Sequence, residues 1–213
     1  RPRSFGLRAR TLPVSEHWGY DRGTPIDRWY IERFLGSHRA DIRGRVLEIK
    51  DDSYTARFGT AVLQSDVLDV DPANSRANVV ADLADAKGIA DESYDCIVLT
   101  QTLQLIYRAA DAVEHSHRML VPGGVLLVTV PAVSRVVLGS PMLVDHWRFT
   151  EASCRALFGV PFRDGSVEVE TYGNALAGAD FLLGYAAEEL SSRELDAVDE
   201  RFPVIVAVRA VRA

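Results

Sequence analysis

Short apolar runs alternate with helix-like stretches from residue 45 onward, and this alternation limits the possible folds more than any other feature of the chain. The apolar runs predict strands over residues 46–49, 61–66, 77–81, 94–100 and 125–130. A brief helix or turn fits residues 53–58, and a helix is predicted over residues 109–120. Strands separated by helices form right-handed βαβ units, so the sequence predicts an α/β domain built on a parallel sheet.

The last third of the chain has a different pattern. It predicts a helix capped by Thr150, a strand, a second helix and a last strand, over residues 150–158, 167–172, 175–190 and 203–211. The two late strands come at the end of the pattern, so we expect them to pair as an antiparallel edge. The sheet then has seven strands and is mostly parallel.

The first forty residues read as an addition to this α/β core. Residues 1–21 show no apolar period and contain Pro, Gly and Ser, which indicates an extended arm. Thr24 is expected to cap a helix with Pro25 at its first position, and Gly36 is expected to end it. We therefore expect one domain over residues 1–213, with an arm and cap helix to residue 40 and the core from residue 45.

The composition excludes several classes of protein. The chain has 213 residues, a formal net charge of −6 and a pI of about 5.4, whereas nucleic-acid binding favours a basic face. Its two cysteines are too few for a disulfide framework and lack the spacing of a zinc site. No apolar run approaches the roughly 20 residues of a membrane helix. We expect a cytoplasmic globular protein without metal that binds neither nucleic acid nor membrane.

Acidic residues lie at the ends of the predicted strands. Glu48, Asp66 and Asp82 fall at or just beyond the carboxyl ends of the first three strands, whereas Asp95 lies at the opposite end of the fourth. In an open α/β sheet, ligands bind at the carboxyl ends. Carboxylates gathered there suit a ligand with hydroxyls and amines, such as a nucleoside or an amino acid. Taken singly, each is also explained as a solvated charge at the end of a strand.

Six segments together carry a resemblance to a known family. They are RGRVLEI, DVLDVDP, NVVADL, DESYDCIVLTQTLQLI, HRMLVPGGVLLVTVP and HWRFT. The chain resembles the class I S-adenosylmethionine-dependent methyltransferases, in particular the small type 11 methyltransferase-domain proteins found among bacterial sugar and natural-product genes. The likeness runs from residue 45 to the end of the chain and is most specific over residues 91–131. It implies a Rossmann-like seven-stranded sheet with an antiparallel last strand.

The resemblance implies a cofactor role for each rim acid. Glu48 matches the acid that neighbours the methionine end of S-adenosylmethionine. Asp66 matches the carboxylate that bridges the two ribose hydroxyls, and Asp69 is the competing alignment for that role. Asp82 and Leu83 match the pair that reads the adenine, through a carboxylate and a backbone N–H.

The turn after the first strand departs from the family. A glycine-rich GxGxG turn is expected there, but residues 50–54 read KDDSY. The side chain of Lys50 either blocks the methionine end or directs its ammonium toward the carboxylate of the cofactor. The missing glycines also argue against a dinucleotide dehydrogenase, and they leave open a non-catalytic binding or scaffold domain. Thr100 and Gln101 match the turn beside the cofactor's sulfur.

The expected reaction is methylation of a small polar acceptor, best interpreted as O-methylation of a sugar or natural product, with S-adenosylhomocysteine as the second product. His146 follows the fifth strand, where the family builds its acceptor site, and histidine titrates near neutral pH, so it is the candidate base. It is equally interpreted as a hydrogen-bonded residue of that loop. Asp145 is expected to orient it or share its role. Arg148 either binds the substrate or, more in keeping with its neighbours, pairs with an acid.

The arm supplies further candidates for the acceptor site. His17, Trp18 and Tyr20 lie on a stretch without period and suit a lid over the acceptor. The alternative is a docking arm in which Trp18 and Trp29 anchor it to the core.

Overall fold

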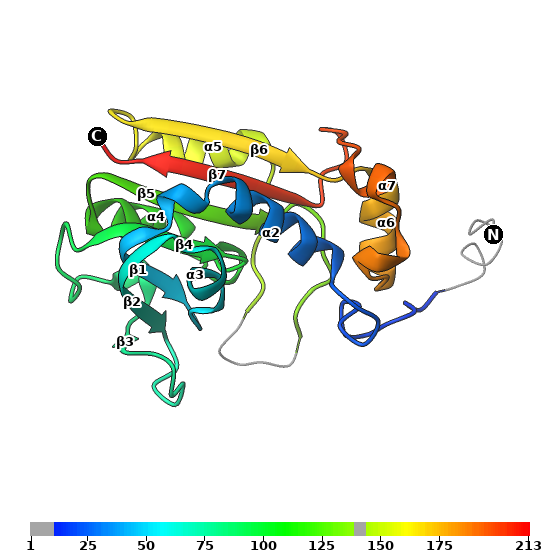
Figure 1. The fold of residues 1–213 in the computed structure, drawn as a ribbon, viewed down its shortest axis with the longest axis horizontal. Helices are drawn as coiled ribbons and strands as arrows, with labels where there is room; N and C mark the ends of the chain where they lie inside the picture. The colour runs from blue at the N-terminus through cyan, green and yellow to red at the C-terminus, as the bar shows by residue number, and fades with distance from the viewer. Residues whose placement is uncertain (1–10, 139–143) are drawn as a thin grey trace.

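The computed structural model describes residues 11–138 and 144–213 and contains one seven-stranded sheet (Figure 1). The strand order is β3-β2-β1-β4-β5-β7-β6. The first ten residues of the predicted arm lie outside the described part of the chain. The strands are β1 (Arg43–Ile49), β2 (Ala61–Asp69), β3 (Val79–Val80), β4 (Tyr94–Thr100), β5 (Leu120–Pro131), β6 (Ser166–Tyr172) and β7 (Ile205–Val211).

The topology confirms the predicted class. Strands β1 to β5 pair in parallel, and β7 is antiparallel to both β5 and β6. From β1 the chain moves outward to β2 and β3, and it then returns to the other side of β1 for β4 and β5. The order therefore reverses between β1 and β4. Ligands of such sheets bind at this point, beyond the carboxyl ends of the strands.

Both faces of the sheet are covered, as the apolar run in β5 predicts. Leu126 and Val128 pack in one buried cluster with side chains of α4 and α5, and Leu127 packs in a second cluster with side chains of α2 and α6. Figure 1 shows α2 crossing the near face of the sheet. The helices are α2 (Ile26–Ser37), α3 (Ser53–Phe58), α4 (Ala109–Met119), α5 (Glu151–Gly159), α6 (Ala175–Leu183) and α7 (Ser192–Asp196).

Several helix ends differ from the expected ones; α2, for example, continues past Gly36 to Ser37 and is capped at its C-terminus by His38. The cap of α2 is Pro25 rather than Thr24, because Thr24 instead donates its N–H and its hydroxyl to the carboxylate of Glu188. The predicted helix over residues 175–190 ends early, since Gly184 adopts a left-handed φ of 79° after α6. Thr150 caps α5 as predicted, with Ser153 closing a capping box.

The strand β2 runs three residues past its predicted end at Asp66, which corrects the placement of that acid. Asp66 lies inside the strand, is 1% exposed and accepts hydrogen bonds from Arg45 Nε (2.8 Å), Gln64 Nε2 (3.0 Å) and Asn78 Nδ2 (2.7 Å). Burial opposes its ionisation, but these hydrogen bonds and the charge of Arg45 hold its pKa below the ordinary value. Asp69 stands at the carboxyl end instead.

We predict that Asp66→Ala destabilises the fold. The substitution removes the carboxylate that accepts hydrogen bonds from Arg45, Gln64 and Asn78. The free energy of unfolding in urea should fall by about 2–4 kcal/mol. Asp69→Ala, the same change three residues later at the half-buried rim, is the control and should cost less than about 1 kcal/mol. Equal losses for the two variants would contradict this.

Candidate cofactor and acceptor site

The turn after β1 keeps a glycine-like backbone without glycine. Lys50 has φ of 75°, in the left-handed region that side chains rarely adopt. Its N–H donates to Leu68 O (2.8 Å), and its carbonyl accepts from Asn74 Nδ2 (2.7 Å). These contacts with β2 and the loop after it hold the turn in place. Lys50 is exposed to solvent.

Glu48 joins the end of β1 to the first turn of α3. Its side chain is buried, and its two carboxylate oxygens accept the backbone N–H of Tyr54 (3.1 Å) and of Thr55 (2.7 Å). Asp51 Oδ1 accepts the N–H of Ser53 (3.0 Å). The first three N–H groups of α3 are therefore used within the protein. Burial raises the pKa of Glu48 to about 7, although the backbone donors act in the opposite direction.

Asp69 has the position and the free acceptor capacity that a ribose diol requires. Its Oδ1 accepts the N–H of Asp71 (3.0 Å) and its Oδ2 accepts Asn74 Nδ2 (2.7 Å). A carboxylate has about four lone-pair sites, so each oxygen can take one more donor. Asp66 has no comparable access, because it is 1% exposed and bound on both oxygens.

Asp82 and Leu83 lie beyond β3, on the same rim. Asp82 is exposed, caps a short 3-10 turn and accepts the N–H of Ala84 at 2.8 Å. The Leu83 side chain is 2% exposed and packs in the core. The role of the Leu83 backbone N–H toward the adenine stays a prediction.

The turn after β4 contains a cluster of buried polar atoms. Gln101 follows Thr100 with a left-handed φ of 47°, and its N–H donates to Thr129 O (2.8 Å). Its carbonyl accepts Gln104 Nε2 at 2.8 Å. Gln101 Nε2, Gln104 Oε1 and Thr129 Oγ1 are buried and have no hydrogen-bond partner among the described residues. Such atoms cost about 1–3 kcal/mol each when left unpaired. Hydrogen bonds from a polar ligand at this end of the sheet would remove that cost.

The sequence reasoning missed Gln104 and Thr129. The signal for Thr129 is one hydroxyl in the otherwise apolar run VLLVTV, at the carboxyl end of β5. The signal for Gln104 is weak, because its burial depends on contacts with a distant loop.

That distant loop carries His146. The N–H groups of His146 and Trp147 both donate to Gln104 O, at 2.8 and 3.2 Å, and Trp147 Nε1 donates to Ile106 O at 3.1 Å. Tyr107 meets the His146 ring edge-on at 5.3 Å and stacks on Trp147 at 6.0 Å. The loop after β5 is thus bound to the turn after β4, with an exposed imidazole and two exposed aromatic rings on its surface.

Asp145 does not orient His146, which corrects that expectation. Its carboxylate binds Arg148 Nη1 (2.5 Å) and Nη2 (3.0 Å) and accepts the N–H of Val137 (3.1 Å). The hydrogen bond and charge of Arg148 hold the pKa of Asp145 below its ordinary value. Arg148 also donates to the carbonyls of Ser134 and Arg135. Arg148 therefore pairs with Asp145 and holds the backbone at residues 134 and 135. These contacts favour the ion-pair interpretation of Arg148 over a contact with the substrate.

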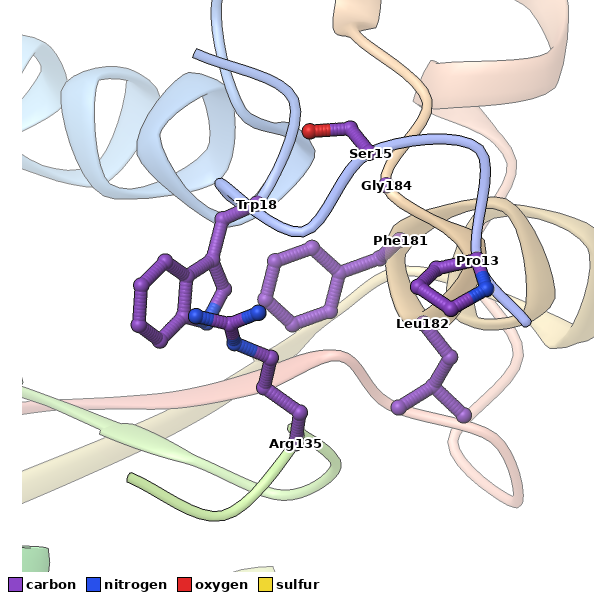
Figure 2. A pocket seen from close by; sticks show the side chains of 7 residues that line it. All are labelled: Pro13, Ser15, Trp18, Arg135, Phe181, Leu182 and Gly184. Carbon is purple, nitrogen blue, oxygen red and sulfur yellow. The ribbon is translucent and has the colours of Figure 1, made fainter. Parts of the chain in front are cut away.

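The arm lies against α6 and the loop after β5. Figure 2 shows the guanidinium of Arg135 over the Trp18 ring, 3.4 Å from its centroid, with Phe181 beside it at a hollow of about 180 Å³. This contact fits the anchoring interpretation of Trp18. Trp29 contacts Tyr30 edge-on within the same helix. His17 is exposed, and Tyr20 Oη accepts Arg28 Nε at 3.1 Å.

None of the helices in residues 11–138 and 144–213 is long and apolar enough to cross a membrane. Within the same ranges, no three His, Cys, Asp or Glu side chains are placed to hold a metal ion.

We predict that Glu48 makes the stability depend on pH. The folded protein holds this proton more tightly than the unfolded chain, so the contribution is present below pH 4.5 and is lost as the pH rises to about 7. It amounts to about 3 kcal/mol. Urea unfolding of wild type and Glu48→Gln from pH about 4 to about 8 measures it, because the stability of wild type relative to the variant should fall across that window. A difference that does not change with pH would contradict the assignment.

Comparison with known proteins gives one family model and a set of solved structures with the same fold. Residues 46–128 match the family model described as "Methyltransferase domain". This segment holds β2 to β4 and most of β1 and β5, with every rim residue from Glu48 to Gln101. A comparison with functionally curated proteins finds no match.

Solved structures share the whole fold at low sequence identity. An S-adenosylmethionine-dependent methyltransferase from Mesorhizobium loti is 17% identical, with 88% of this chain and 98% of that chain covered and a TM-score of 0.55. A putative sarcosine dimethylglycine methyltransferase from Galdieria sulphuraria is 15% identical, with 89% and 90% covered and a TM-score of 0.57. The N-methyltransferase NodS from Bradyrhizobium japonicum, in complex with S-adenosylhomocysteine, is 14% identical, with 93% of each chain covered and a TM-score of 0.55.

These structures establish the fold, and the family model establishes the domain that β1 to β5 form. The strand order, the antiparallel β7 and the switch point between β1 and β4 are in accord with both. Residues 46–128 thus match the methyltransferase-domain family, and the chain shares its fold with solved S-adenosylmethionine-dependent methyltransferases.

Proposed function

We propose that this enzyme transfers a methyl group to a hydroxyl oxygen of a small polar acceptor, a sugar or a natural product. One observation carries the proposal. The loop after β5 is tied through two backbone hydrogen bonds to Gln104 O, next to the turn after β4, so the exposed His146 ring stands at the rim where the sheet order reverses. A base placed there suits an acceptor that must lose a proton.

The described residues fit the adenosyl part of the cofactor. We assign the ribose hydroxyls to Asp69, because it stands at the carboxyl end of β2 with acceptor capacity left on both oxygens. Asp82 and the backbone of Leu83 are assigned to the adenine. Thr100 and Gln101 border the sulfur, where the unpaired amide of Gln101 offers a donor.

The methionine end has to be held differently from a glycine-rich site. Glu48 orders the turn, but its carboxylate accepts the N–H groups of Tyr54 and Thr55 in the first turn of α3, so these donors cannot bind a ligand. Lys50 keeps the left-handed turn and is exposed to solvent. A positively charged side chain near α3 is then the natural partner of the methionine carboxylate.

On the acceptor side, His146 takes the proton from the acceptor hydroxyl. S-adenosylmethionine, when bound, supplies an electrophilic methyl group on a sulfonium sulfur. His146 is exposed and can pass its proton to solvent. The Asp145–Arg148 pair fixes the loop backbone, and the exposed faces of Tyr107 and Trp147 offer a surface for the ring of an acceptor.

We predict that Asp69→Ala lowers the affinity for S-adenosylhomocysteine roughly 10- to 100-fold, because charged hydrogen bonds to the ribose are lost. Isothermal titration calorimetry measures the affinity. Asp71→Ala is the matched control, since Asp71 lies two residues on and its carboxylate accepts the N–H of Ala73. Unchanged binding by the Asp69 variant would remove the ribose assignment.

We predict that His146→Ala reduces kcat by roughly 10²- to 10⁴-fold, as expected for loss of a general base. Affinity for S-adenosylhomocysteine should stay the same, because His146 contacts the acceptor side. The measurement is release of S-adenosylhomocysteine with a panel of sugars and phenols, first with wild type to find an acceptor. Full turnover by the variant would exclude His146 from the reaction.

A further inference from the structure

A groove runs between α2 and α3, beside the end of the crevice where the methionine part of the cofactor is expected. Its volume is about 370 Å³. Ser53 and Tyr54, the first residues of α3, form one wall directly after the turn at Lys50. The full lining is Tyr20, Gly23, Thr24, Pro25, Arg28, Glu32, Ser53, Tyr54 and Arg57.

The backbone at this wall has no donors to spare for an anion. The N–H groups of Ser53, Tyr54 and Thr55 already donate to Asp51 and Glu48. A glycine turn would let a ligand approach bare backbone, but here Lys50 and Tyr54 stand at two of the expected glycine positions. A carboxylate in this region therefore requires a side-chain cation.

Of the two arginines that line the groove, only Arg28 is free of an ion pair with another residue of the lining. Arg57 is already paired with Glu32, which lines the same groove. Arg28 donates to two neutral phenols, Tyr20 Oη at 3.1 Å and Tyr54 Oη at 3.5 Å. Its Nη2 makes no hydrogen bond to any described residue.

The nearest countercharge of Arg28 is weak. Asp27 is the one carboxylate within 4.0 Å of it in the described part of the chain, at 3.9 Å from Nε, and it is 8% exposed. Burial raises the pKa of Asp27 above its ordinary value. The Arg28 side chain itself remains 30% exposed, so a ligand can reach it.

We propose that Arg28 binds the carboxylate of the amino-acid end of S-adenosylmethionine in this groove, in place of the approach to bare backbone that a glycine-rich turn allows. The planar guanidinium fork matches a carboxylate in a two-point contact. Tyr20 and Tyr54 hold the fork from either side. This assignment rests on the proposed function, because it requires the adenosyl part to lie along Asp69 and Asp82.

Two ligands separate the ends of the cofactor. S-adenosylhomocysteine has the amino-acid carboxylate, whereas 5′-methylthioadenosine has the adenosine and the thioether sulfur without it. Arg28→Met should lower the affinity for S-adenosylhomocysteine roughly 10- to 100-fold in calorimetric titration and leave that for 5′-methylthioadenosine unchanged. Arg28→Lys, which keeps the charge without the fork, should recover part of the loss.

Two control variants test the choice of cation. Arg57→Met removes the paired arginine of the same groove, and Lys50→Met removes the exposed cation of the turn. Neither should change the ratio of the two affinities by as much as Arg28→Met does. If Lys50→Met alone lowers the affinity for S-adenosylhomocysteine, the proposal for Arg28 is overturned.

The remaining outcomes distinguish this proposal from the proposed function. If wild type binds both ligands and Arg28→Met binds them in the same ratio, Arg28 does not hold the carboxylate and the adenosyl assignments stand. An equal loss of both ligands also overturns the proposal, because it reports a general change in the site. If wild type binds neither ligand, both proposals fail.

Discussion

The buried carboxylate of Glu48 determines how the rest of the site is built. Its two oxygens tie the end of β1 to the first turn of α3, at 3.1 and 2.7 Å, so the connection after β1 is held by a side chain rather than by a tight glycine turn. The same bonds consume the helix donors that would otherwise face a ligand. Lys50 keeps a left-handed backbone in this connection, and we propose that anion binding shifts from the backbone to the side chain of Arg28.

The fold was largely predictable from the sequence because burial leaves a strong periodic signal. The runs over 94–100 and 53–58 match β4 and α3 in both bounds, since a strand buried on both faces and a short helix ended by Gly59 have clear limits. The antiparallel pairing of β6 with β7 followed from their place at the end of the pattern. The strict alternation of residues 167–172 matches the partly exposed edge strand β6.

The site was less predictable because its geometry depends on contacts between distant residues. Asp66 reads as the end of a strand, but inside β2 it pairs with Arg45 and accepts a hydrogen bond from Asn78, and the strand continues to Asp69. Asp145 is next to His146 in the sequence, but its carboxylate pairs with the guanidinium of Arg148. Arg28 and Tyr54 are 26 positions apart, so nothing in a local pattern indicates that they share a groove.

The position of β7 constrains how the sheet can be assembled. β7 follows β6 in the chain but lies between β5 and β6, with seven residue pairs on each side. Until β7 is in place, β6 has no partner strand, and the surface under α2 lacks Ile205 and Ala207. The packing of α2 on the sheet therefore depends on residues that come much later in the sequence.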